Sequence, residues 1–281
     1  MSATAIANEV TELTTFPDIA FRISDLLNDE NSSAWDIGAL IEQDPGLAAA
    51  LLRIANSALY NSGVPITAVD RAVAVVGAQE VRDLAFGLCA RSTLDGIPNE
   101  LVQMKDFWMH SLYSAAAAKT IAKTLKIRTR ESLFMAGLLH DVGQLVLFSQ
   151  RPEQSREALL LAIETTDGTQ TSKAEQDIFG FDHTAVGAAL MTAWSLPDYL
   201  ADVALYHHDP SAKDTPSAIV DVVHIANSLA VLAELSSENL DDAPPIDEDA
   251  MTRIGMTTDA IPEVMTGTHE AVAELQSVFL N

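Results

Sequence analysis

Residues 72–88 read AVAVVGAQEVRDLAFGL and place apolar side chains three and four positions apart, which is the spacing of one face of an α-helix. The same spacing recurs in residues 19–27 and 48–54, whereas strand-like alternation of apolar and polar residues is scarce. We therefore predict an all-α chain.

Two prolines mark predicted helix starts. Asp44 precedes Pro45, and Ser195 stands shortly before Pro197, so in each case a side chain that can cap a helix comes before a residue whose missing N–H costs nothing in the first turn. Residues 218–235 are rich in Val and Ile. Their length and largely apolar character favour a buried helix over a strand.

The distribution of polar residues predicts four segments. An N-terminal helical lobe is expected in residues 1–95 and a second helical bundle in residues 96–235. Residues 236–250 combine acidic, small and proline residues, as exposed linkers do, and a C-terminal helical segment is expected in residues 251–281. Acidic residues concentrate towards this end of the chain.

The composition indicates which binding partners and which cellular compartment are expected. The 281 residues carry a net charge of −24, so the long-range field repels nucleic-acid phosphates and anionic lipids, and we expect neither as a partner. The longest uncharged stretch, residues 54–69, contains a glycine and a proline, and no signal peptide is evident at the start. With Cys89 as the only cysteine, these features predict a cytoplasmic protein.

Tryptophans at helical spacing to apolar neighbours usually pack in a core. We expect Trp35, Trp108 and Trp194 to pack in the core or between the lobes rather than to stack on a ligand.

Histidines are the residues most able to carry chemistry in this chain. A single histidine on a helix is usually a core or surface residue, since its ring nitrogens can bond nearby groups. Here six of the seven lie in motif-like or apolar stretches, and His269 alone looks incidental. The six are His110, His140, His183, His207, His208 and His224.

The His140-Asp141 pair offers one nitrogen and one oxygen donor to a metal ion. Imidazole and carboxylate suit divalent ions such as zinc, manganese, iron and nickel. The pair follows the apolar run LFMAGLL at 133–139, and a buried carboxylate is costly unless a cation or hydrogen-bond donor meets it. The sequence therefore predicts a partner for Asp141.

His207 and His208 are expected at the end of a helix, because Asp209-Pro210 stops it. A helix end favours positive charge, so compensation of the helix dipole is one interpretation of the pair. The end of the helix also frees the backbone enough for both imidazole rings to face one site. Spacing alone does not show that the histidines converge, because no short metal signature is present.

Several stretches together form a family pattern. They are QDPGL at 43–47, LLRIAN at 51–56, FWMHS at 107–111, AGLLHDVG at 136–143, FDH at 181–183, WSLP at 194–197 and HHDP at 207–210. This pattern closely resembles the HDOD domain of bacterial signalling proteins, over about residues 15–235. The resemblance implies a two-lobed helical fold whose second lobe is HD-domain-like.

The resemblance also implies a metal site. HDOD domains are similar to the HD and HD-GYP phosphohydrolases, whose histidines and aspartates bind two or more metal ions that activate water. Carried over position by position, the ligands of a divalent transition metal (Fe, Mn, Zn or Ni) would be His110, His140, Asp141, His183, His207, His208 and His224, the last in place of a final aspartate.

Two departures from the hydrolases bear on activity. Gln144 stands where they have a lysine after the His-Asp motif, and Asp209-Pro210 follows the histidine pair where a Gly-Tyr-Pro loop would begin. Losing the lysine removes a donor suited to a transferring phosphoryl group. We therefore expect a regulatory module without catalytic activity that acts on a signalling protein on a separate chain. A metal-dependent phosphohydrolase and a sensor that binds a nucleotide or small anion are the alternatives.

Overall fold

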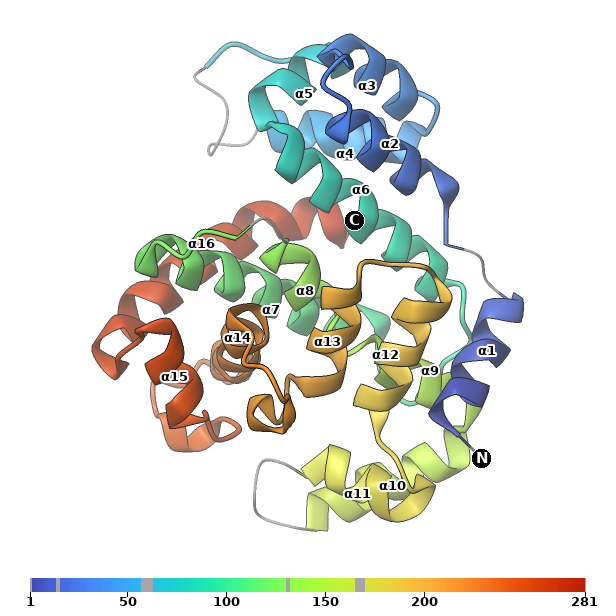
Figure 1. Cartoon of the computed structure of the whole chain (residues 1–281), viewed down its shortest axis with the longest axis vertical. Coiled ribbons are helices and arrows are strands. Elements are labelled where there is room, and N and C mark those ends of the chain that lie inside the picture. Colours follow the sequence, from blue (N-terminus) through green and yellow to red (C-terminus); the bar gives the residue numbers. More distant parts are fainter. Residues whose placement is uncertain (1, 14–15, 57–62, 130–131, 165–169, 281) are drawn as a thin grey trace. The chain divides into compact units, whose positions relative to one another are not determined.

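The computed structural model describes residues 2–13, 16–56, 63–129, 132–164 and 170–280, and all regular elements within these ranges are helices, as predicted. Figure 1 shows the order of the helices along the chain. The chain divides into two compact units. Unit 1 contains Met1–Thr15 and Leu94–Val272, and unit 2 contains Phe16–Thr93 and Ala273–Asn281.

Unit 2 is a small bundle of short helices. They are α2 (Asp18–Asn28), α3 (Ala34–Ile41), α4 (Pro45–Ala55), α5 (Val69–Val76) and α6 (Ala78–Asp95), whose last two residues belong to unit 1. The Asp44 side chain caps α4 as predicted, accepting the N–H groups of Gly46 and Leu47 at 2.8 and 3.1 Å. Phe16 and Phe86 stack in the core, with ring centroids 5.8 Å apart.

The apolar period of residues 72–88 is shared by two helices rather than one. Gly77 lies between α5 and α6 with a φ of 92°, a backbone conformation that glycine adopts at little cost. The three-to-four spacing of apolar residues continues before and after Gly77 because α5 and α6 each bury one face. The structure thus confirms helices there and adds the break.

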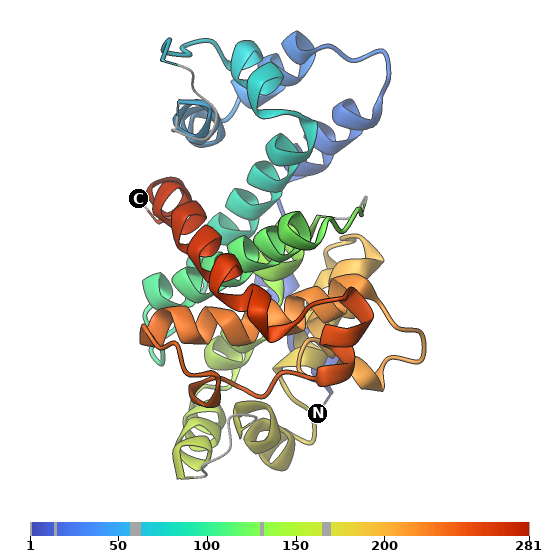
Figure 2. The same cartoon turned by 90° about the vertical axis from the view of Figure 1, so that its left-hand side faces the viewer.

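Unit 1 is built around two long helices, α7 (Met104–Leu125) and α14 (Ala218–Leu235), which pack side by side (Figure 2). The other helices that the structure describes in it are α1 (Ala3–Leu13), α8 (Leu133–Leu139), α9 (Val142–Gln150), α10 (Pro152–Glu164), α11 (Gln170–Phe179), α12 (His183–Ala193), α13 (Asp198–Tyr206), α15 (Glu248–Ile254) and α16 (Ile261–Phe279), with short 3-10 turns η1 (Pro210–Ala212), η2 (Leu240–Asp242) and η3 (Thr258–Ala260). The end of α16, from residue 273, belongs to unit 2.

The predicted helix at 218–235 is α14, with the expected bounds. It is the one helix of the described chain that is long and apolar enough to cross a membrane, but 78% of it is buried within the fold. Its apolar character is therefore that of a core helix.

The first helix belongs to unit 1. It lies against α12 and α9, and the Arg151 guanidinium donates to both carboxylate oxygens of Glu9, at 2.7 and 2.9 Å. A bidentate pair of this kind sets the orientation of the helix as well as its position. The N-terminal lobe expected in residues 1–95 thus lacks its first helix.

The segment expected as a linker, 236–250, is largely exposed but contains structure. It includes η2 and the start of α15, which packs on α14. Arg253 of α15 donates to both carboxylate oxygens of the buried Asp221 of α14, at 2.6 and 2.9 Å. This pair anchors the helix that follows the acidic segment.

The start of α13 differs from the prediction. The residue before the helix is Pro197, and no side chain caps the first turn. Ser195 instead ends α12 in a left-handed conformation, with a φ of 54° and its N–H bonded to the carbonyl of Thr192. Ser195 lies two residues before the cap position, which Pro197 occupies, so its side chain does not cap α13.

Two of the three tryptophans lie in the core, as predicted. Trp194 is buried, and Trp108 is buried with its indole N–H donating to Asp95 at 2.7 Å. Trp35 is 68% exposed, so the prediction of core packing is wrong for this residue. It is the second residue of α3, and the buried positions of that helix begin at Ile37.

A close backbone approach joins the starts of α9 and α12. A Cβ atom at Gly143 would overlap the carbonyl oxygen of His183 and would lie 2.6 Å from the amide nitrogen of Gly187. Only glycine allows the two backbones to come this close. The contact holds the segment after Asp141 against the first turn of α12.

We expect Gly143→Ala to lower the free energy of unfolding by about 1–3 kcal/mol, since the added methyl group forces two packed helices apart. Urea denaturation followed by circular dichroism measures this change. Gly187→Ala is the matched control, because a Cβ there would meet Ala204 at an ordinary 3.4 Å. Equal effects of the two substitutions would contradict the assignment of the close contact to Gly143.

Candidate metal centre

The centre is built on the turn between α8 and α9. Every residue of α8 is buried, so the two residues that follow it, His140 and Asp141, are held inside unit 1. The His140 ring donates from Nδ1 to the carbonyl of Gly137 at 2.7 Å, because a carbonyl oxygen can only accept. The ring is thereby fixed with Nε2 directed to Asp141 Oδ2, 3.2 Å away.

His207 is fixed in the same way at the end of α13. Its Nδ1 donates to the carbonyl of Ala204 at 3.0 Å, and its Nε2 lies 3.1 Å from Asp141 Oδ1. Burial lowers the pKa of His207 to about 4, so the ring is neutral at pH 7 and Nε2 carries a lone pair. A lone pair and a carboxylate oxygen therefore face each other with no proton between them.

His183 and His208 complete one side of the centre. His183 is the first residue of α12, and its Nε2 lies 3.4 Å from Asp141 Oδ1 and 3.0 Å from His208 Nε2. Burial and the neighbouring His207 hold the pKa of His208 well below its usual range. The nitrogen and oxygen donors of Asp141, His183, His207 and His208 all lie within 4.8 Å of one another.

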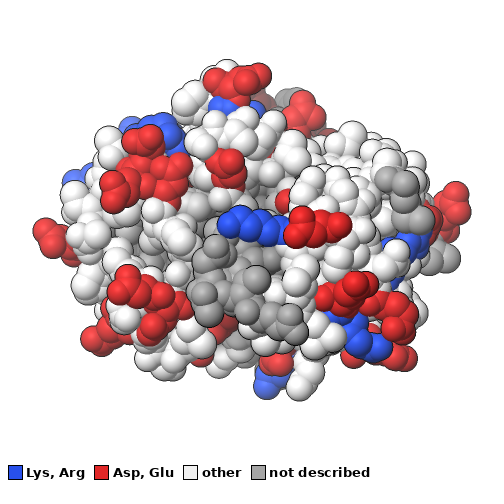
Figure 3. All heavy atoms as spheres, turned by 90° about the horizontal axis from the view of Figure 1, so that it is seen from below, with Lys and Arg blue, Asp and Glu red and all other residues white. Residues whose placement is uncertain are grey.

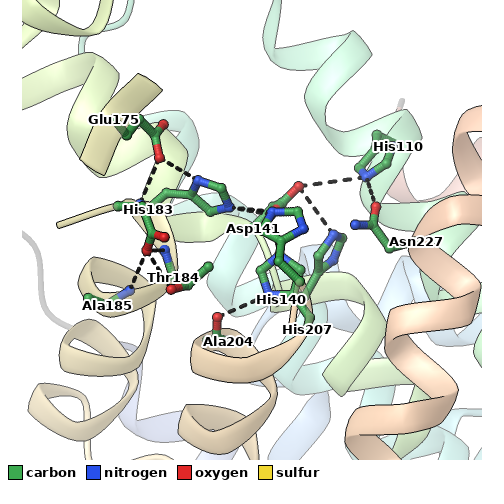
Figure 4. Close-up of polar contacts among 12 residues, drawn as sticks. His110, His140, Asp141, Glu175, His183, Thr184, Ala185, Ala204, His207 and Asn227 are labelled. Atoms are coloured by element: carbon green, nitrogen blue, oxygen red, sulfur yellow. Dashed lines mark hydrogen bonds and ion pairs between the residues drawn. The ribbon is translucent and has the colours of Figure 1, made fainter. Parts of the chain in front are cut away.

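His110 approaches Asp141 from α7 and forms a second group with it and His140, whose donor atoms also lie within 4.8 Å of one another. Its Nε2 is 3.7 Å from Asp141 Oδ2. Burial opposes the charged ring, but Glu234, 3.0 Å from Nδ1, raises the pKa of His110. Figure 4 shows the side chains converging on Asp141.

Asp141 is the one residue common to both groups. It is 6% exposed. Burial opposes its charge, but the neighbouring His140 and His183 hold the pKa of this carboxyl well below its usual range. An ionised carboxylate therefore lies at the middle of a set of imidazoles, and among the described side chains no lysine or arginine forms an ion pair with it.

The donor set fits a divalent metal ion. Three buried atoms of the centre have no hydrogen-bond partner: His140 Nε2, His207 Nε2 and Asp141 Oδ1. Such atoms are costly in a protein interior unless a cation meets them. Imidazole nitrogen with carboxylate oxygen is the ligand chemistry of zinc, manganese, iron and nickel.

His224, predicted as a ligand, does not join the centre. Its Nδ1 donates to the carbonyl of His207 at 2.7 Å, and its Nε2 accepts the N–H of Asp247 at 2.9 Å. Both ring nitrogens bond to backbone groups, and the ring belongs to neither group of clustered donor atoms. Two other residues of α14 reach His110: the Oδ1 of Asn227 lies 3.0 Å from its Nε2, and Glu234 lies 3.0 Å from its Nδ1.

Sequence reasoning missed three supporting residues. Glu234 and Asn227 hold His110, and Glu175 of α11 accepts from both the N–H and the ring of His183. Asn227 could have been found, since it stands three positions after His224 on the same helix. Nothing in the polar sequence around Glu175 marks it.

Comparisons with known proteins agree with this description. The model of the HDOD domain family matches residues 13–210. An HDOD domain protein of unknown function from Geobacter sulfurreducens superposes with a TM-score of 0.72 at 28% identity, covering 99% of this chain and 94% of that one. A candidate phosphohydrolase from Shewanella amazonensis SB2B superposes with a TM-score of 0.76 at 22% identity, covering 99% and 98%, which shows the shared fold.

A curated relative extends beyond the matched region. An uncharacterised protein of Treponema pallidum (strain Nichols) is 25% identical over 227 residues. The match covers 80% of this chain and 43% of the relative, so the chain spans less than half of that protein's length.

We expect His224→Ala to leave the metal content unchanged and to lower the free energy of unfolding of the metal-free protein by about 1–3 kcal/mol, because two buried backbone groups lose their partner. Mass spectrometry of bound metal and chemical denaturation in chelator measure the two quantities. His269→Ala, at an exposed histidine, is the control. Loss of bound metal in His224→Ala would show that this ring is a ligand.

Proposed function

Because this chain belongs to the HDOD domain family, we propose that it is a regulatory module of signal transduction that binds a divalent transition metal and does not catalyse a reaction. The observation that supports metal binding is the orientation of His140 and His207. Each ring donates from Nδ1 to a carbonyl and turns Nε2 towards the buried carboxylate of Asp141. A cation satisfies all of these atoms together.

We propose two positions for an ion, which share Asp141. One lies among Asp141, His183, His207 and His208, and the other among His110, His140 and Asp141. The metal would be zinc, manganese, iron or nickel, by the softness of these ligands. When bound, such an ion supplies a positive charge that balances the carboxylate and polarises any oxygen ligand.

The proposed absence of catalysis is supported by the surroundings of the centre. Gln144 stands one turn after His140 and carries no charge to place on a transferring phosphoryl group. After the histidine pair, Asp209 accepts the N–H of Ala212 and closes the short turn η1. A compact turn of this kind occupies the place where the similar hydrolases have a substrate loop.

We propose that the partner is a signalling protein on a separate chain and that the protein acts in the cytoplasm. Acidic side chains gather in several groups on the face seen in Figure 3, where basic ones are few, which supports a partner other than a nucleic acid or an anionic membrane. Cys89 is buried, and burial raises the pKa of its thiol to about 12. An inert thiol suits a reducing compartment.

A metal-dependent phosphohydrolase is the second candidate. It is favoured by two groups of ligands that share one carboxylate, since paired ions stabilise attacking and leaving oxygens in phosphoester cleavage. Among the described residues, the ion-pair partners of Asp141 are all histidines, with no lysine or arginine. The lack of such a cation beside the centre weighs against phosphoester hydrolysis.

We expect the purified protein to bind metal but to hydrolyse bis(p-nitrophenyl) phosphate with Mn²⁺ or Fe²⁺ no faster than His140→Ala and Asp141→Ala do. Bound metal is measured by mass spectrometry and hydrolysis by absorbance. His269→Ala should keep the wild-type metal content. Turnover in the wild type that both centre variants abolish would establish the hydrolase instead.

Removing the metal should lower the melting temperature. An ion that binds the native state alone, at a free concentration 100 times its dissociation constant, adds about 2.7 kcal/mol to stability. Differential scanning calorimetry with and without chelator measures the shift. An unchanged melting curve in a protein shown to be metal-loaded would count against a structural contribution of the ion.

A further inference from the structure

The helices α10 and α11 form a hairpin that packs mainly on itself (Figure 1). It has a small core of its own, made of Ala158, Ala162 and Ala174 with Leu161 and Ile178 against them. α11 makes few contacts with α12 and the hairpin touches the rest of unit 1 chiefly through α9. Because the hairpin buries few apolar residues against the rest of unit 1, its position depends on individual contacts.

Glu175 is the buried ionisable residue of this hairpin. It is 1% exposed, and its Oε2 accepts the N–H of His183 at 2.8 Å and the Nδ1–H of the same residue at 2.6 Å (Figure 4). The ion pairs of the described residues give it no lysine or arginine. Among the described residues, the ion-pair partner of this carboxylate is the imidazole of His183.

The two bonds determine which nitrogen of His183 meets the centre. With Nδ1 donating to Glu175, the ring presents Nε2, which lies 3.4 Å from Asp141 Oδ1. A carboxylate behind a metal-binding imidazole fixes the ring and makes the facing nitrogen a better donor. A cation at Nε2 in turn polarises the Nδ1–H bond and strengthens its hydrogen bond to the carboxylate.

We propose that Glu175 is a positioning residue that couples occupation of the metal position at Asp141, His183, His207 and His208 to docking of the α10–α11 hairpin. This inference rests on the metal binding proposed above. Because coupling between two equilibria is reciprocal, a metal that strengthens the Glu175–His183 contact holds the hairpin more tightly, and a docked hairpin raises the affinity for the metal by the same factor.

The experiment compares Glu175→Gln with the wild-type chain. Affinity for Zn²⁺ and Mn²⁺ is measured by competition with a chromophoric chelator, and amide hydrogen exchange of residues 152–164 and 170–179 is followed by mass spectrometry with and without Zn²⁺. We expect Glu175→Gln to weaken metal binding about 10- to 100-fold. We also expect Zn²⁺ to slow exchange in the wild-type hairpin and to have little effect in the variant.

Asp182→Asn is the matched control. Asp182 caps the same end of α12, accepting the N–H groups of Thr184 and Ala185 at 3.1 and 3.4 Å, but it does not touch the His183 ring. It should therefore share any loss of helix stability while keeping metal affinity and the Zn²⁺-dependent protection of the hairpin. The visible absorption of bound Co²⁺ should change in Glu175→Gln and stay unchanged in Asp182→Asn.

The outcomes separate this inference from the proposed function. A wild-type chain that binds no metal overturns the proposed function and the coupling with it. A wild-type chain that binds metal with the same affinity as Glu175→Gln overturns the coupling alone. If Glu175→Gln does not fold, the wild-type exchange experiment still decides, because hairpin amides that exchange at the same rate with and without Zn²⁺ contradict the coupling.

Discussion

The burial of one ionised carboxylate, that of Asp141, is the constraint on which unit 1 depends. An isolated charge in such a place would be expensive, and the fold meets the cost by bringing imidazoles to it from α7, the α8–α9 turn, α12 and the end of α13. Five helices, α7, α8, α9, α12 and α13, must therefore begin, end or pass near one point. The fully buried α8 makes this possible, because it carries the carboxylate inward with no exposed face of its own.

Much of this arrangement could be predicted from the sequence. Apolar periodicity and the proline at position 45 predicted the helices, because helix formation leaves a local pattern in the sequence. The candidate ligands came from the resemblance of the motifs around His110, His140, His183 and His207 to the HDOD family, since spacing alone did not show that the histidines converge. Contacts between distant segments were not predictable in this way. The hydrogen bonds that occupy both nitrogens of His224 and the packing of α1 on α12 depend on tertiary structure.

His224 and Glu175 show how far the centre extends beyond its donor atoms. His224 links the backbone of His207 to the N–H of Asp247, just before α15, and Glu175 links the ring of His183 to α11. Each contact ties a peripheral segment to a residue beside Asp141. In the regulatory role proposed above, a sub-ångström shift at the centre would be passed to α15 and to α11 through one side chain each.

The close approach at Gly143 has an evolutionary consequence. The backbones of α9 and α12 meet where no side chain fits, so the position tolerates a single amino acid for as long as the histidine on the opposing helix has to stay near the carboxylate. A larger residue at this position would force α9 and α12 apart and move the first turn of α12, with its histidine, away from the carboxylate. In related chains, a residue other than glycine here would therefore indicate that the two helices have separated.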